Sequence, residues 1–68
     1  MSMPTELATA VRERRRALGL TQQETGELAG VSAKFIRDFE RGKDSVRLDK
    51  LTDLLDVLGL ALRVEVSR

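Results

Sequence analysis

Charged side chains recur at helical spacing in the middle of the chain and could bind an anionic partner. A helix predicted over residues 33–41 carries these side chains on its outward face: Lys34, Arg37, Asp38 and Arg41. Its other face, with Ile36, Phe39 and Glu40, turns inward. Amide donors at the start of such a helix, together with long cations, suit the phosphates and guanine edges of DNA. An ordinary solvated face remains the alternative, since such faces are common on surface helices.

The composition excludes several other chemistries. The 68 residues contain no Cys and no His, which rules out disulfides, thiol nucleophiles, His-dependent triads and zinc sites built from either residue. The net charge is only +1, but residues 1–43 hold eight basic and six acidic residues, whereas residues 44–68 hold four and five. An anionic partner should therefore meet the N-terminal part. We predict no enzyme, no cofactor, no metal site, no membrane segment and no secretory leader.

Capping residues and glycines divide the chain into four predicted helices. The first runs from about Thr5 to Leu18 with the apolar stripe Leu7, Val11 and Leu18. The second begins with the capping box of Thr21 and Glu24 and ends near Ala29. Ser32 caps the third, and the fourth covers residues 48–58, although Arg47 is a poor cap. Five leucines of the fourth helix should face inward: Leu48, Leu51, Leu54, Leu55 and Leu58. Glycines in the left-handed conformation should close the helices at Gly19, Gly30, Gly42 and Gly59.

The last residues change to the two-residue period of a β-strand. Apolar side chains at Leu60, Leu62, Val64 and Val66 alternate with Ala61, Arg63, Glu65 and Ser67. A lone strand leaves its backbone groups unpaired, so a second copy of the chain should supply the partner strand. We predict an antiparallel dimer interface made by Leu60, Leu62, Arg63, Val64, Glu65 and Val66.

Two short helices joined by Gly30-Val31-Ser32 match the helix-turn-helix arrangement, which presents its second helix to the major groove of DNA. The spacing of Thr21-Gln22, Gly30-Val31-Ser32 and Glu40-Arg41-Gly42-Lys43 resembles the Xre/Cro-type helix-turn-helix family over residues 7–60. Phe35-Ile36-Arg37-Asp38 and Val46-Arg47-Leu48-Asp49-Lys50-Leu51 are similar to its HipB-like regulators, many of which are antitoxins. The predicted fold is therefore all-α, with four helices in a DNA-binding domain (residues 1–59) and a dimerising β-strand (residues 60–68).

The resemblance implies roles for individual residues. Gln22 would hold a backbone phosphate, and Ser32 would cap its helix with a phosphate contact as a secondary role. Ala33 and Lys34 occupy base-contacting positions; Ala33 can offer only a methyl group to thymine. Arg37, one turn further on, is our candidate for a bidentate guanine contact, and Lys43 would displace counterions. These predicted DNA-binding residues are Gln22, Ser32, Ala33, Lys34, Arg37 and Lys43.

Other charged and aromatic residues have two interpretations. Asp38 could accept a bond from cytosine, but a pair with Lys34 or Arg41 is preferred. Phe35 should pack rather than contact thymine. The family ties its first helix to Glu40 through an arginine: Arg15 matches that position better, although the helical wheel places Arg14 closer to the core. Arg12 and Arg16 are expected to be solvated.

The sequence departs from the family pattern where Thr25 and Gly26 replace the usual Leu-Ala. Thr25 removes apolar surface, and Gly26 should weaken the helix by about 0.5–1 kcal/mol relative to alanine. We expect Leu28 to take over part of the packing.

The function that these residues predict is sequence-specific DNA-binding repression, with autoregulation of its own operon. The expected partners are a palindromic double-stranded operator, a second copy in a homodimer and, on resemblance alone, a kinase-like toxin of a HipBA-like pair. The expected location is the cytoplasm, on the nucleoid. The alternative is a protein-interaction module of the same fold that neutralises a partner without reading DNA.

Overall fold

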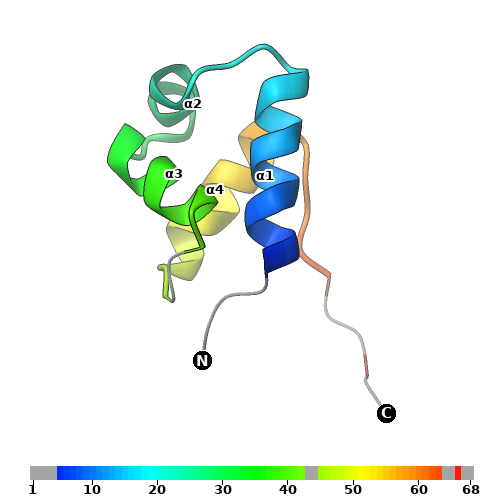
Figure 1. Cartoon of the computed structure of the whole chain (residues 1–68). Coiled ribbons are helices and arrows are strands. Elements are labelled where there is room, and N and C mark those ends of the chain that lie inside the picture. The colour runs from blue at the N-terminus through cyan, green and yellow to red at the C-terminus, as the bar shows by residue number, and fades with distance from the viewer. Residues whose placement is uncertain (1–4, 43–44, 64–65, 67–68) are drawn as a thin grey trace.

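Four helices form in the order that capping and glycine spacing predict. The computed structural model describes residues 5–42, 45–63 and 66, and its helices are α1 (Thr5–Ala17), α2 (Gln22–Ala29), α3 (Ala33–Glu40) and α4 (Leu48–Leu58) (Figure 1). The four predicted glycines all have positive φ angles. The all-helical prediction is confirmed. No strand occurs in the described part of the chain, and residues 60–63 leave the end of α4 without regular structure (Figure 1).

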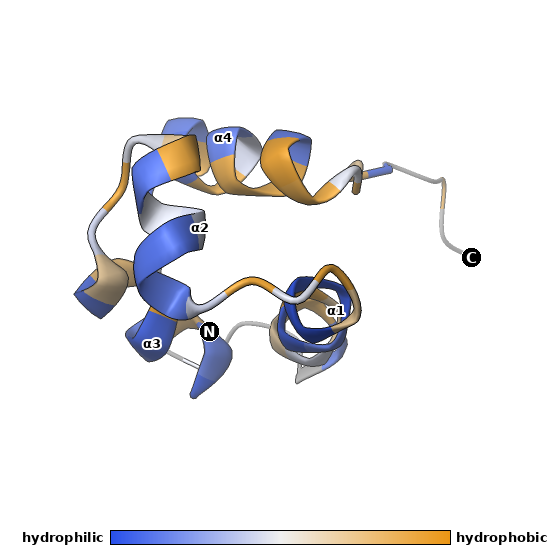
Figure 2. Ribbon diagram, turned by 90° about the horizontal axis from the view of Figure 1, so that it is seen from above, coloured by the Kyte–Doolittle hydropathy of each residue, from blue (hydrophilic) through white to orange (hydrophobic). Residues whose placement is uncertain are grey.

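The core joins all of the helices except α2 through apolar side chains. α1 and α2 each pack against both α3 and α4. The buried cluster contains Val11 from α1, Ile36 and Phe39 from α3, and four leucines of α4: Leu51, Leu54, Leu55 and Leu58. Figure 2 shows the hydrophobic side of α4 turned toward the other helices and its hydrophilic side turned outward. No helix of the described residues is both long and apolar enough to cross a membrane.

Three leucines that were expected in the core are exposed instead. α1 ends at Ala17, so Leu18 lies in the turn that follows it, and Leu48 is the first residue of α4, at the edge of the core. Leu28 is 64% exposed. It lies about 200° around the helix from Gly26, one of the two buried residues of α2, so it points away from the packed side. The expectation that Leu28 replaces the missing apolar surface is therefore wrong.

The buried side of α2 consists of Thr25 and Gly26. Thr25 is completely buried, and its hydroxyl donates to the carbonyl oxygen of Thr21 at 2.8 Å. A Cβ atom on Gly26 would lie 2.5 Å from the carbonyl oxygen of Val31, closer than real Cβ contacts come. The turn between α2 and α3 thus passes directly over Gly26. A glycine that was expected only to weaken the helix is the residue that this close approach requires.

Candidate nucleic-acid interface

The start of α3 is fixed by a side-chain cap. Ser32 has an extended backbone, and its hydroxyl accepts the backbone N–H of Phe35 at 2.9 Å. This confirms Ser32 as the N-cap and places Ala33 and Lys34 in the first helical turn, where backbone amides and the positive end of the helix dipole are concentrated. Ala33 is half-buried, whereas Lys34 and Arg37 are exposed. The structure thus places both predicted base-contacting cations on the outer side of α3.

Asp38 lies between these two cations. The Lys34 ammonium is 2.8 Å from one carboxylate oxygen of Asp38, and Nε of Arg37 is 3.8 Å from the other. The preferred interpretation of Asp38 as a pairing residue is confirmed. Exposed pairs at this spacing contribute only about 0.3–0.5 kcal/mol, so a polyanion can displace Asp38 from Lys34 at little cost.

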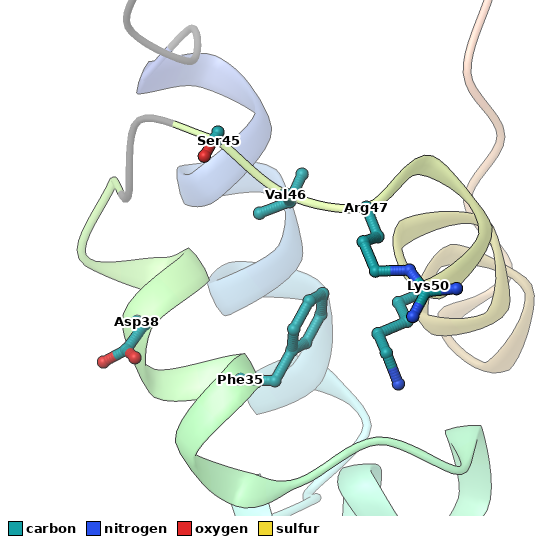
Figure 3. A pocket seen from close by; sticks show the side chains of 6 residues that line it. All are labelled: Phe35, Asp38, Ser45, Val46, Arg47 and Lys50. Carbon is teal, nitrogen blue, oxygen red and sulfur yellow. The ribbon is translucent and has the colours of Figure 1, made fainter.

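Phe35 packs, as expected, and does not stand free on the outer face. Its ring is stacked on that of Phe39, with centroids 6.5 Å apart and planes inclined by 10°. Phe35 also borders a hollow of about 450 Å³ whose lining includes Val46, Arg47 and Lys50 (Figure 3). Arg47 there is already paired with Asp49 at 2.8 Å. The hollow lies between α3 and the start of α4, and no buried side-chain N or O atom of the described residues lacks a hydrogen-bond partner there.

A hydrogen-bonded network ties α3 to α1 and to the start of α2. Arg15 donates from Nε and Nη2 to the two carboxylate oxygens of Glu40, at 2.7 and 3.0 Å, and from Nη1 to the carbonyl oxygen of Leu20 at 2.8 Å. Only 10% of the Arg15 side chain and 5% of the Glu40 side chain are exposed. Hydrogen bonding to Glu40 raises the pKa of Arg15 above its ordinary value. Arg15, rather than Arg14, is therefore the arginine that joins the first helix to the third.

Gln22 joins the same network from the first turn of α2. Its side-chain amide donates to a carboxylate oxygen of Glu40 at 3.2 Å. An amide nitrogen carries two hydrogens, so this bond leaves one donor for another acceptor. The structure thus holds the Gln22 side chain in one orientation beside the end of α3.

The capping box at the start of α2 is present with both of its hydrogen bonds. Thr21 Oγ1 accepts the backbone N–H of Glu24, and a carboxylate oxygen of Glu24 accepts that of Thr21, each at 2.9 Å. The bond from the Thr21 backbone N–H is the main cause that lowers the pKa of the Glu24 carboxyl. The box fixes the entry into α2 and so the position of Gln22.

The structure describes only some of the predicted DNA-binding residues and of the predicted dimer-interface residues. Lys43, Val64 and Glu65 lie outside the described residues. Leu60 packs against the core, and its N–H donates to the carbonyl oxygen of Leu55 at 2.8 Å. The apolar side chains of Leu62 and Val66 are exposed. The side chain of Arg63 is exposed as well.

Sequence reasoning missed one residue that holds the domain together. Arg14 donates from Nε to the carbonyl oxygen of Leu58 at 2.8 Å, and so joins α1 to the end of α4. The only signal in the sequence was the run of arginines 14–16 at the end of the first helix, which does not say which helix each of them reaches.

Two helices that pack together across a tight turn, with cations on the exposed side of the second helix, define a helix-turn-helix protein. The helix-turn-helix family model matches residues 11–64, and the chain belongs to this family, which consists of DNA-binding transcription regulators rather than enzymes. The chain is 33% identical over 61 residues to the uncharacterized HTH-type transcriptional regulator y4mF of Sinorhizobium fredii, covering 90% of this chain and 80% of that one.

Solved structures agree with this assignment. A HipB–O1–O2 complex matches with a TM-score of 0.81 and 29% identity over 97% of this chain and 96% of that one. A HipA–HipB–O2–O3 complex matches with a TM-score of 0.83 and 28% identity, covering all of this chain and 96% of that one. The resemblance to HipB-like regulators of the Xre type is confirmed.

Proposed function

We propose that this protein is a sequence-specific DNA-binding repressor of the HipB type. The observation that carries the proposal is the fixed position of α3, whose outer side presents Lys34 and Arg37 while its inner side is held by the core and by the Arg15–Glu40 pair. A helix restrained in this way keeps its outer cations at constant positions relative to a groove, which base recognition requires. A relative named as a transcriptional regulator and HipB structures titled as O1–O2 and O2–O3 complexes support this function.

The proposed division of labour follows the chemistry of each side chain. Arg37 makes the bidentate contact to a guanine edge, Lys34 takes a base or a phosphate, and the Ala33 methyl group meets a thymine methyl group. Gln22 and Ser32 position the domain on backbone phosphates, and Lys43 adds a further cation. Phosphate contacts set the register of α3, and Arg37 reads the sequence.

We further propose that the segment 60–68 forms the second functional part, a strand that pairs with its copy in a homodimer. Val66 is 94% exposed and Leu62 is exposed as well, so this short segment carries apolar side chains that its own domain does not cover. With the two-fold axis beside Val64, Leu62 would face the partner's Val66 and Arg63 would face the partner's Glu65. Slipping the axis by one residue would bring two arginines together. Such a dimer suits a palindromic operator.

The proposed setting is autoregulation of its own operon on the nucleoid in the cytoplasm, as the antitoxin of a HipBA-like pair. The HipA–HipB–O2–O3 complex contains a chain similar to this one together with a HipA partner. We propose that this protein likewise binds a HipA-like, kinase-like toxin while it is on DNA.

The testing experiment is a gel shift with DNA taken from upstream of the protein's own gene, against shuffled DNA of the same composition. Repression requires a clear preference for the upstream DNA, together with an affinity that falls steeply as salt is added. Equal affinity for both DNAs at every salt concentration would instead favour a protein-interaction module that does not read DNA.

A further inference from the structure

A second cationic surface lies beside the recognition helix. A hollow of about 410 Å³ opens where the second half of α1 meets α3 and the start of α2. We call it the arginine basin, after the arginines that line it: Arg12, Arg15, Arg16, Arg37 and Arg41. Its lining also includes Gln22 and one acidic residue, Glu40. The basin brings together residues that are far apart in the sequence, because α1 packs against α3.

The positive charge of the arginine basin is not neutralised by the residues that line it. Glu40 is taken up by the bidentate bond of Arg15, so this pair contributes no net charge. Arg12, Arg16 and Arg41 are exposed, and their guanidinium groups make no hydrogen bond or ion pair within the described part of the chain. Arg12 and Arg16 are also one helical turn apart on α1, a spacing at which like charges repel. An anion in the basin would remove this repulsion.

The donor geometry favours phosphate among anions. Guanidinium groups present planar pairs of N–H donors that fit phosphate oxygens in a bidentate manner. Gln22 lies at the first position of α2, where helix amides have no partner within the helix and the dipole is positive. Its side-chain amide keeps one free hydrogen after the bond to Glu40. Guanidinium and amide donors from three helices therefore converge on one place.

We propose that the arginine basin binds phosphates of the DNA backbone beside the base-contacting face of α3. This inference rests on the proposed function and extends the interface onto α1, through Arg12 and Arg16. Arg37 lines the basin and also lies on the outer side of α3, so the two surfaces are continuous. Contacts of this kind carry no sequence information, so the basin adds affinity and salt dependence without adding specificity.

The test compares the full-length protein with R12Q, R16Q and the double variant on operator and shuffled duplexes at several salt concentrations. Each lost phosphate contact should reduce the steepness of the plot of log K against log salt by about 0.9. The double variant should thus lose almost 2 in slope, weaken binding to both duplexes by the same factor and keep the operator preference. R12K/R16K should restore the slope, because lysine keeps the charge.

The variant K50Q is the matched control, since it removes one positive charge from α4, outside the basin. K50Q should leave the slope unchanged. A slope change in K50Q as large as that in R12Q would mean that only total charge matters, which overturns the proposal. If the wild-type protein binds DNA steeply and R12Q/R16Q matches it, the basin proposal fails alone. If the wild-type protein shows no operator preference, the proposed function fails first.

Free polyphosphate is the other source of the same chemistry. NMR signals of the arginine Nε–Hε groups in a ¹⁵N-labelled protein, assigned with the R12Q and R16Q variants, distinguish binding of DNA from binding of free polyphosphate. Addition of duplex DNA should shift the Arg12 and Arg16 signals at concentrations where pyrophosphate and ATP leave them in place. Saturable shifts with pyrophosphate or ATP alone, together with an unchanged DNA slope in the double variant, would overturn the assignment to DNA.

Discussion

Arg15 and Glu40, 25 residues apart in the sequence, form a bidentate ion pair with Nε–Oε2 and Nη2–Oε1 distances of 2.7 and 3.0 Å. The pair joins the last turn of α1 to the last residue of α3, and Gln22 bonds to the same carboxylate. A single acidic side chain thus fixes three elements that surround the candidate interface. Such a pair fixes the orientation of the helices more than it stabilises the fold, because the cost of burying two charges offsets much of their attraction.

Breaking this pair from one side should be costly. Glu40→Ala leaves the Arg15 guanidinium largely buried without a counterion, so we expect a loss of about 3 kcal/mol in the free energy of unfolding, measured by urea denaturation. Arg15→Met with Glu40→Leu should be less destabilised than the two single variants suggest, because no charge is then stranded. Single variants that cost less than about 0.5 kcal/mol would show that the pair is solvated in solution.

Gly26→Ala should destabilise the protein although alanine is the better helix former. The added methyl group meets the Val31 carbonyl at 2.5 Å, which forces the turn away from α2. We expect a net loss of about 1–3 kcal/mol by thermal or urea unfolding. The neighbouring exposed variant Glu27→Ala is the control and should have little effect. A Gly26→Ala protein as stable as wild type would mean that the turn relaxes freely.

Arg37 should determine the base preference, and Gln22 should position the protein on the DNA backbone. Arg37→Ala should cost about 1–3 kcal/mol in operator binding and relax the preference at one base pair of each half-site. Gln22→Ala should weaken binding to all DNA sequences by a similar factor, because phosphate contacts do not distinguish bases. Affinities for a set of single-base operator variants separate the two effects. Retained base preference in Arg37→Ala would place α3 differently in the groove.

Truncation of the chain after Ala61 should give a monomer. This end point keeps Leu60, whose N–H bonds to Leu55 and whose side chain packs on the core, so the domain itself should stay folded. Sedimentation equilibrium should report the monomer mass, and operator binding should weaken strongly because two half-sites are no longer read together. A truncated protein that still sediments as a dimer would contradict the strand pairing.

The capping box should make stability depend on pH through Glu24. Its pKa is lower in the folded protein than its ordinary value of 4.5, chiefly through the backbone N–H of Thr21. The stabilisation is therefore complete above the ordinary pKa and is lost as pH falls through the folded-state value. Glu24→Gln keeps an acceptor but does not titrate, so its free energy of unfolding should fall less between pH 6 and pH 3 than that of wild type. Parallel pH profiles would contradict this role.

The sequence was sufficient for local features. The Thr21–Glu24 box, the Ser32 cap and the helix-closing glycines follow from rules that act within a few residues, and all of them formed as expected. The Arg15–Glu40 pair came from the family resemblance, since the helical wheel favoured Arg14. A helical wheel describes one helix in isolation. Which arginine of α1 bonds to Glu40 depends on how α3 packs against α1.

What the sequence did not reveal depends on distances between elements. Nothing in the periodicity of α2 shows that the following turn passes over Gly26, and the helix-propensity rule takes no account of this contact between elements. Leu48 matched the apolar period of α4 but lies at its first residue, where the core has ended. Arg12 and Arg16 look like isolated surface charges until α1 is placed against α3.

The bond from Arg14 to the Leu58 carbonyl has a consequence for operator architecture. It joins α1 to the last residue of α4, directly before Gly59, where the chain departs from the axis of that helix. In two protomers joined through their final residues, the angle of this departure sets how far apart the two α3 helices lie. The number of base pairs between half-sites would then depend on Arg14, a residue bonded only within its own domain.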